Sequence, residues 1–289
     1  MVEVNAVSKQ LGTFHLEDIS FALPAGYICG LVGQNGAGKT TLLHLLLGLY
    51  GADKGQITVH KMNYNLDEKQ IHDIIGTVLV EELFDSHYSI GRNADYYGKF
   101  FSKYSRERMA EYLERFKLDS HKKFGGLSRG EKLKCQFAFA LSYDPVLLIL
   151  DEPTGNFDPD FREQFFKILQ EFIIDGNKSV ILATHLTEDL DRLADYLIYL
   201  EKGKQIFAGD IESFRQGYRI VSGEKYKINT IAKNRIVHIE ERRYGAKALV
   251  KHRQYRQYDD MLEVTYPTIE EFMYFYSKRG ENDDKIFHQ

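Results

Sequence analysis

The stretch Gly33-Gln-Asn-Gly-Ala-Gly-Lys-Thr-Thr41 decides the fold of this chain. It fits the P-loop pattern G-x-x-x-x-G-K-[ST], with Gly33, Gly38, Lys39 and Thr40 at the fixed positions. Glycines allow successive backbone N–H groups to turn inward into an anion-binding concavity, which a Cβ would obstruct. Lys39 can reach the β- and γ-phosphates of a nucleotide, and the Thr40 hydroxyl can bind Mg²⁺. The pattern therefore predicts a site for nucleotide phosphates.

The residues on both sides of this loop have the composition that such a site requires. Residues 27–32 form an apolar run typical of a buried strand, and residues 41–47 are rich in leucine, as in a buried helix. Bound phosphate would lie at the N-terminus of that helix, where the helix dipole and free N–H groups favour negative charge. A glycine-rich turn would match the pattern by accident in about one chain in a hundred of this length, so we expect nucleotide binding. The residues expected to contact the nucleotide are Gly33, Asn35, Gly36, Gly38, Lys39, Thr40 and Thr41.

Composition and charge place further bounds on the protein. At 289 residues the chain is long enough for one large domain and a smaller one. Its formal net charge of −4 predicts no general attraction to nucleic acid or to membrane surfaces. Cys29 and Cys135 lie far apart and show no metal-ligand spacing, so two reduced, inert thiols in the cytosol are the simpler interpretation.

Two observations bear on membranes and secretion. Residues 1–6 lack a basic segment followed by an apolar run, so we expect no signal peptide. No uninterrupted apolar run of about 18 residues occurs, so we expect that the chain does not span a bilayer. Any role at a membrane would then depend on a partner protein.

Alternation of apolar strands with helices predicts an α/β fold. Residues 146–150 and 179–183 are continuous β-branched and aliphatic runs, as in parallel strands that are covered on both faces. Helical patterns at 160–174 and 188–194 follow these strands, which is the order found in an α/β sheet. Residues 1–32 show an alternating pattern instead, which predicts a β-rich layer.

Two segments depart from this alternation. Residues 86–125 are rich in Tyr, Phe, Arg and Lys with helical spacing, which predicts a helical insert; with the helix after it, the helical subdomain covers about 86–143. After about residue 210, short strand patterns and a final helical pattern predict a small α+β appendage. We therefore expect a main domain at 1–210 and an accessory domain at 211–289.

The apolar run 146–150 ends in Asp151 and Glu152. A carboxylate at the end of a buried strand beside a P-loop can hold the Mg²⁺ shell, a role that we assign to Asp151. Glu152 can polarise a water for in-line attack on the γ-phosphate, as a general base. Acidic strand exits are also common in α/β proteins without a catalytic role, but an apolar run, two acids and a P-loop together favour the catalytic interpretation.

His185 follows the apolar run 179–183. A histidine in such a place is more often structural or exposed than catalytic. Here it leaves the sheet at the same edge as Asp151, where the ligands of doubly wound sheets bind. We therefore expect His185 to sense the γ-phosphate or to orient the attacking water.

Five elements in order resemble the ATP-binding subunit of an ABC transporter, over roughly residues 1–210. They are 33–41, 127–131, 147–154, Asp158 and His185. The sequence Leu-Ser-Arg-Gly-Glu at 127–131 is the most specific of them, because P-loops and acidic strand ends occur in many NTPases. The resemblance implies a P-loop NTPase of the ABC type, with an antiparallel β subdomain and a helical insert, that hydrolyses ATP with Mg²⁺.

In that family two ATPase subunits pack head to tail, so the resemblance implies a dimer. The helix that follows Leu127 in one subunit would cover the ATP bound to the other, with Ser128 and Gly130 contacting the γ-phosphate in trans. Asp158 would lie in the loop that links the two sites. Ser128 and Glu131 also form a capping box, S-x-x-E, so we expect Ser128 to begin that helix as well.

The chain departs from the family pattern at several positions. Arg129 stands in place of a glycine, and Glu131 in place of a glutamine. The family's glutamine after the strand that enters the helical subdomain is missing, so we take Glu81 as its substitute at the metal. Leu11 occupies the place of the aromatic residue that usually stacks on adenine, which leaves Phe14 as a candidate for that contact.

The appendage contains two further patterns. Residues 251–258, Lys-His-Arg-Gln-Tyr-Arg-Gln-Tyr, interleave basic and aromatic residues as single-stranded nucleic-acid binders do. A solvated surface is the simpler interpretation in a mildly acidic protein, so we expect no direct nucleic-acid partner. Residues 267–273, with a capping box formed by Thr268 and Glu271, resemble the C-terminal segment of ATPase subunits from drug- and peptide-exporting (ABC-2-like) systems, which favours export.

The function implied is an ATP-hydrolysing motor subunit that dimerises on ATP and drives export through a separate membrane permease. The permease would hold it at the cytoplasmic face of the cell membrane, with the helical insert as the docking surface. Glu152, His185 and Lys39 would be its catalytic residues. A homodimer is the simplest pairing.

Two alternatives stay open. One is a soluble ABC-type ATPase that acts on a cytosolic assembly, such as a ribosome, DNA or a cluster-assembly partner. Relatives that act on ribosomes usually carry two ATPase units in one chain, and those that act on DNA insert a coiled coil for which 42–126 is too short. The other is a nucleotide-gated binding module, which Arg129 and the missing glutamine favour and the intact Glu152 and His185 oppose.

Overall fold

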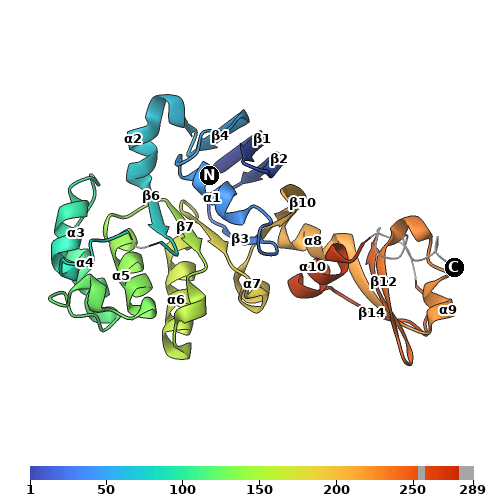
Figure 1. Ribbon diagram of the computed structural model, residues 1–289. Coiled ribbons are helices and arrows are strands. Elements are labelled where there is room, and N and C mark those ends of the chain that lie inside the picture. Colours follow the sequence, from blue (N-terminus) through green and yellow to red (C-terminus); the bar gives the residue numbers. More distant parts are fainter. Residues whose placement is uncertain (82, 253–257, 280–289) are drawn as a thin grey trace. The chain divides into compact units, whose positions relative to one another are not determined.

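The computed structural model describes residues 1–81, 83–252 and 258–279 (Figure 1). The chain separates by its internal packing into two compact units. The first consists of Met1–Leu186 and Ile198–Ala208, and the second of Thr187–Leu197 and Gly209–Gln289. The second unit therefore takes in helix α7 (Thr187–Leu193), which comes between two strands of the main sheet in the sequence.

A mixed sheet of ten strands forms the centre of the first unit, in the order β5-β4-β1-β2-β10-β9-β3-β8-β7-β6. The order differs from the order in the sequence, because crossover connections return the chain to non-neighbouring positions. The strands are β1 (Val2–Leu11), β2 (Phe14–Leu23), β3 (Ile28–Val32), β4 (Lys54–Val59), β5 (Met62–Asn63), β6 (Ile75–Val78), β7 (Leu147–Asp151), β8 (Ser179–Ala183), β9 (Tyr196–Glu201) and β10 (Lys204–Asp210).

The two halves of this sheet differ because their sequence patterns differ. β1 pairs in antiparallel fashion with β2 and β4, and β2 shows largely alternating burial. β3, β7 and β8 consist wholly of buried residues and pair in parallel, in the order β3-β8-β7-β6. Strands that are apolar on both faces need cover on both sides, which crossover helices supply. The predicted α/β core with a β-rich N-terminal layer is confirmed.

Helices that follow the parallel strands bring the ends of those strands to one edge of the sheet. Helix α1 (Lys39–Leu46) follows β3 and buries four leucine side chains. Helix α6 (Pro159–Ile173) follows β7; it begins at Asp158, whose side chain accepts a hydrogen bond from the backbone N–H of Phe161. Because β3, β7 and β8 run in the same direction, the residues that follow each of them gather at this edge.

The helical subdomain is built around aromatic side chains. It contains α3 (Ile90–Gly98), α4 (Arg106–Arg115) and α5 (Arg129–Ser142), and α2 (Tyr64–Ile74) precedes it. Phe84 meets Phe124 and Phe139 in edge-to-face contacts with centroid distances of 5.3 and 5.2 Å. Phe101 stacks on Tyr143 at 3.9 Å. Such pairs explain why a segment with so many Tyr and Phe residues forms a packed element.

The second unit contains an antiparallel sheet of four strands in the order β12-β13-β11-β14. The strands are β11 (Tyr218–Gly223), β12 (Ile236–Arg242), β13 (Gly245–Lys251) and β14 (Glu263–Thr265), and the helices besides α7 are α8 (Ile211–Gly217), α9 (Lys225–Ile228) and α10 (Ile269–Ser277). The predicted short strands are present, whereas the three-residue β14 has too short a pattern to be found in the sequence.

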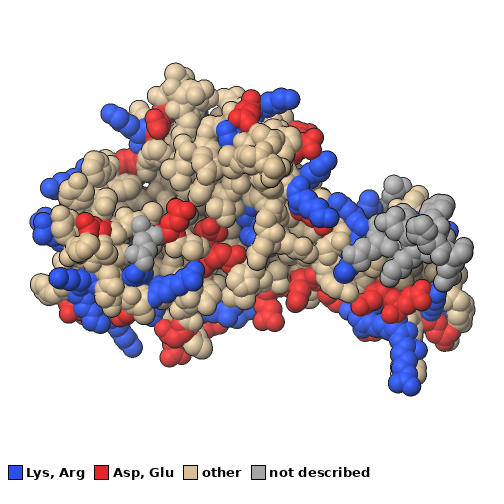
Figure 2. Space-filling view, viewed as in Figure 1, with Lys and Arg blue, Asp and Glu red and all other residues tan. Residues whose placement is uncertain are grey.

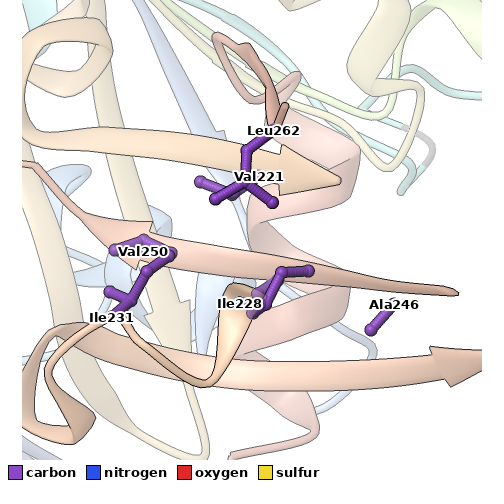
Figure 3. Close-up of a cluster of buried hydrophobic side chains, with 7 residues drawn as sticks. Val221, Ile228, Ile231, Ala246, Val250 and Leu262 are labelled. Atoms are coloured by element: carbon purple, nitrogen blue, oxygen red, sulfur yellow. The ribbon is translucent and has the colours of Figure 1, made fainter. Parts of the chain in front are cut away.

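The sheet of the second unit has its own apolar cluster (Figure 3). Its buried members are Val221, Ile228, Ile231, Ala246, Ala248, Val250 and Leu262. Helix α10 begins at the predicted capping box, in which Thr268 and Glu271 each accept a hydrogen bond from the other's backbone N–H. The second unit thus has an apolar core of its own. Of the basic and aromatic run 251–258, residues 253–257 lie outside the described part of the chain.

Two surface observations complete the description. Acidic and basic side chains are interspersed over the face shown in Figure 2, in keeping with the small net charge. Among the residues that the structure describes, no helix has both the length and the apolar character needed to cross a membrane.

Candidate active site

The P-loop adopts the conformation that its glycines allow. Gly36 and Gly38 have φ angles of +77° and +109°, in the left-handed region that other residues rarely adopt. A Cβ on Gly33 would lie 2.5 Å from the carbonyl oxygen of Leu200, and a Cβ on Gly38 would lie 2.8 Å from Leu16 Cδ1. Gly38 begins α1 without a side-chain cap, so the first N–H groups of the helix are available to an anion.

Lys39 is positioned inside this loop. Its side chain is buried, and Nζ donates a hydrogen bond of 2.7 Å to the carbonyl oxygen of Gly33. A neutral carbonyl compensates a buried ammonium only in part, because it carries no opposite charge. A phosphate group in the loop would supply that charge.

Thr40 and Asp151 meet across the edge of the sheet. The Thr40 hydroxyl lies 3.5 Å from Asp151 Oδ2, although 111 positions separate the two residues. Burial raises the pKa of Asp151, and the neighbouring Glu152 raises it further, whereas Lys39 acts in the opposite direction. The ionised form of the Asp151 carboxylate is therefore destabilised in this environment, and a cation bound beside it would stabilise that form.

The oxygen atoms of Thr40 and Asp151 fit Mg²⁺. This ion prefers hard oxygen ligands, and in nucleotide sites it takes one or two from the protein and the rest from phosphates and water. Within the described residues no group of three or more His, Cys, Asp or Glu side chains gathers as a complete metal cage. Thr40 and Asp151 would be the protein's ligands to such an ion.

Glu152 and His185 form the most direct contact between two predicted catalytic residues. His185 Nδ1 lies 2.7 Å from Glu152 Oε2, and the backbone N–H of His185 donates to the same oxygen over 3.1 Å. Glu152 has a φ of +47°, and its own N–H donates to the carbonyl oxygen of Ala183. A non-glycine residue in this conformation is uncommon, so the backbone here is held by its neighbours to aim the carboxylate.

These groups surround a cavity of about 600 Å³. Its lining residues are Phe14, Gln34, Asn35, Gly36, Ala37, Gly38, Lys39, Thr40, Thr41, His44, Leu79, Val80, Glu81, Asp151 and Glu152. Gly33 and His185 are not lining residues, but each contacts one: Gly33 is bonded to Lys39, and His185 to Glu152. Phe14 lines it and Leu11 does not, which favours Phe14 as the aromatic partner of a nucleotide base.

Ser128 and Gly130 lie away from this cavity, at the start of α5. Ser128 is exposed and forms the predicted capping box, in which its Oγ accepts from the Glu131 N–H and Glu131 Oε2 accepts from the Ser128 N–H. A Cβ on Gly130 would lie 2.6 Å from the carbonyl oxygen of Asn156, so a glycine lets α5 approach that loop closely. Within one chain the structure does not bring these residues to the P-loop, and their action in trans stays a prediction.

Sequence reasoning missed Gln136. This residue of α5 is 2% exposed, and its side-chain amide binds the backbone of Leu79 and Glu81, both of which line the cavity. The available signal was an amide within the otherwise largely apolar segment 133–141, since a buried amide needs partners. The sequence cannot say which backbone groups those partners are.

In sequence, the chain is similar to ATP-binding proteins of ABC transporters. The family model described as ABC transporter matches residues 16–155. The chain is 35% identical over 214 residues to the Nod factor export ATP-binding protein I of Rhizobium leguminosarum bv. viciae, covering 72% of this chain and 68% of that protein. The protein of the same name from Rhizobium meliloti is 32% identical over 251 residues, covering 83% of this chain and 75% of that one.

Solved structures share the fold. An ATP-binding subunit of an ABC transporter superposes with a TM-score of 0.70 at 22% identity, covering 74% of this chain and 92% of that chain. The ATP-binding cassette MJ0796, solved as a dimer in a post-hydrolysis state bound to ADP and phosphate, gives a TM-score of 0.66 at 22% identity. It covers 73% of this chain and 99% of the cassette.

Proposed function

The chain belongs to the ATP-binding proteins of ABC transporters, and on that premise we propose that it is the ATPase motor of an exporter. As an ABC transporter ATPase it binds and hydrolyses ATP. The observation that carries the proposal is the convergence of Lys39, Asp151 and the Glu152–His185 pair at one edge of the parallel sheet. The export direction is supported by the Nod factor export proteins, which it resembles over more than two thirds of their length.

The residues divide the work of phosphoryl transfer among them. Lys39 and the N–H groups at the start of α1 hold the β- and γ-phosphates, and they stabilise charge that develops on the transferred group. Thr40 and Asp151 would hold a Mg²⁺ ion, which would supply positive charge beside the phosphates, and Glu81, which lines the same cavity, would contribute a further oxygen. Glu152 accepts the proton of the attacking water, and His185 orients Glu152 through the contact of 2.7 Å.

We further propose that two copies of the chain pair around two ATP molecules. The start of α5, with Ser128 and Gly130, would meet the γ-phosphate held by the other copy. Both residues lie at the N-terminus of α5 and do not line the cavity of their own chain. An interaction with a nucleotide bound to another copy needs this placement. The cassette MJ0796, which has the same fold, was solved as a dimer.

The transporter partner would be a separate membrane permease that docks on the helical insert and holds the ATPase at the cytoplasmic face. The exposed side chains of Tyr96, on α3, and Phe100, just after α3, are 53% and 72% accessible and provide apolar area for such a contact. Their rings meet each other at 6.4 Å.

The test is recovery of the Glu152→Gln protein from detergent-solubilised native membranes in the presence of ATP and Mg²⁺, followed by mass spectrometry. A polytopic membrane protein in stoichiometric amount is the expected result. The matched control is the Lys39→Ala protein, which should recover less of it because ATP no longer holds the dimer. A soluble assembly or nucleic acid without any membrane protein would overturn the exporter assignment.

A further inference from the structure

The nucleotide cavity has one wall that does not come from the P-loop or from the strand ends. It consists of Leu79, Val80 and Glu81, which come directly after β6, the last strand of the sheet. β6 is an edge strand, and its register with β7 ends at the pair Val78–Leu150, so the segment 79–81 lies beyond the paired part of the sheet. Something else must hold this wall in place.

The side-chain amide of Gln136 holds it. Oε1 accepts a hydrogen bond from the backbone N–H of Leu79 over 3.2 Å, and Nε2 donates to the carbonyl oxygen of Glu81 over 3.1 Å. With 2% of its surface exposed, Gln136 has little access to water that could replace these bonds. Loss of the bond to Leu79, which is 5% exposed, would leave a buried N–H without this partner, and such a loss destabilises more than the bond itself contributes.

The same helix approaches β6 at a second point. The Tyr143 hydroxyl donates to the carbonyl oxygen of Ile75 over 3.0 Å. A Cβ on Gly76 would lie 3.3 Å from the carbonyl oxygen of Ala140, so a glycine lets strand and helix pack closely here. Tyr143 therefore fixes the start of β6, and Gln136 fixes the segment beyond its end.

From this geometry we infer that Gln136 is a positioning residue for ATP hydrolysis, which ties the Leu79–Glu81 wall of the cavity to helix α5. The inference rests on the proposed function, since it concerns the Mg²⁺ and water side of that site. α5 begins at Ser128, eight residues before Gln136, and eight residues of helix span about 12 Å. A displacement of α5, by a second subunit at its start or by a permease on the insert, is thus carried to Glu81 through one buried amide.

The test compares Gln136→Met, which keeps the length of the side chain and removes both hydrogen bonds, with Tyr143→Phe, which removes the bond at the far end of β6. In Gln136→Met we expect kcat to fall about tenfold, with KM for ATP within twofold, and the Mg²⁺ concentration for half-maximal rate to rise several-fold. Hydrogen exchange in peptides that contain the Leu79 amide should accelerate about tenfold, as expected for the loss of one buried hydrogen bond. Tyr143→Phe should lower thermal stability and leave the Mg²⁺ dependence unchanged.

Two results would overturn the inference. One is faster exchange at Leu79 with kcat and Mg²⁺ dependence within twofold of wild type. The other is a Tyr143→Phe protein that shows the same kinetic defect. That result would mean that Gln136 only stabilises the packing of α5. If Gln136→Met does not fold, Gln136→Glu keeps the acceptor for the Leu79 N–H and should show an intermediate kcat, whereas an unchanged kcat there would also count against the inference. A failure of the exporter assignment would appear in the membrane pull-down and leave these comparisons intact.

Discussion

The two sides of the nucleotide cavity are held in different ways. On one side the P-loop, Asp151 and Glu152 lie at the ends of strands that have hydrogen-bonded neighbours on both edges. The backbone on this side includes uncommon conformations, with positive φ angles at Gly36, Gly38 and Glu152. On the other side Leu79–Glu81 lies beyond an edge strand and is held by Gln136.

The difference teaches which side of the site can move. Groups on interior parallel strands are positioned by many backbone hydrogen bonds at once, so a small force on one helix does not displace them. The Leu79–Glu81 wall depends on two hydrogen bonds from a helix of the helical subdomain, so it moves with that helix. We expect the chemistry to depend on the first side and its regulation on the second. Substitutions of Glu152 and Lys39 test the first side, Phe14→Ala tests the base end of the cavity, and Asp158→Asn tests another contact of α5, the helix that carries Gln136.

The largest effect is expected for Glu152→Gln, on the rigid side. The amide keeps the volume of the side chain and an oxygen for the His185 N–H, but it cannot accept the proton of water. Steady-state phosphate release should fall about 10²- to 10⁴-fold, the usual contribution of a general base, with ATP binding retained. Release within a few-fold of wild type would remove Glu152 from this role.

Lys39→Ala should mainly weaken nucleotide binding. The substitution removes the buried ammonium that we propose binds the phosphates, and we expect ATP affinity to fall about 10- to 100-fold, as for the loss of a hydrogen bond to a charged group. Isothermal titration with ATP and Mg²⁺ measures it. Lys99→Ala, an exposed lysine outside the cavity lining, is the matched control and should bind as wild type does. Equal affinities for the two variants would contradict the P-loop assignment.

Phe14→Ala tests the base end of the cavity and should have a smaller effect. Stacking of a base on an aromatic ring is worth about 1–3 kcal/mol, so ATP affinity should fall about tenfold or somewhat more. Inorganic triphosphate has no base and should bind equally well to both proteins. Leu11→Ala, outside the cavity lining, is the control. An equal loss of affinity for triphosphate would show that Phe14 stabilises the P-loop and does not stack on the base.

The smallest effect is expected at the link between α5 and the loop after β7, where Lys134 Nζ binds Asp158 Oδ2 at 2.8 Å. The hydrogen bonds from Lys134 and from the Phe161 N–H lower the pKa of Asp158 in the folded state. The ion pair therefore stabilises the fold above the pKa of an unfolded Asp, about 3.9, and this contribution disappears as pH falls through the lower folded value.

Asp158→Asn isolates this charge, since asparagine still caps α6. At pH 7 the variant should melt at most about 3 °C below wild type, because exposed ion pairs contribute little. Below about pH 4 the difference in melting temperature should shrink. A difference that grows on acidification would contradict the assigned direction of the pKa shift.

Much of the molecule could be predicted from local patterns. The apolar runs that became β7 and β8 indicate buried parallel strands, because only a sheet that is covered on both faces accepts such sequences. The capping boxes at Ser128 and Thr268 marked two helix starts within a residue. That Asp151 and His185 lie at the same edge of the sheet could be inferred from strand direction alone. These predictions succeeded because each rests on a residue and its near neighbours.

The sequence by itself therefore determined the chemistry and its approximate place: a phosphate loop, two carboxylates and a histidine at the ends of buried strands. Only the tertiary structure decided that Glu152 and His185 touch, that Phe14 and not Leu11 lines the cavity, and that Gln136 holds Leu79 and Glu81. The physical reason is that a motif fixes the backbone conformation and the charges of its own segment, so its chemistry can be inferred locally. A buried amide or an aromatic ring needs contact partners, but its own sequence does not identify them. Those partners are determined when distant segments pack against one another.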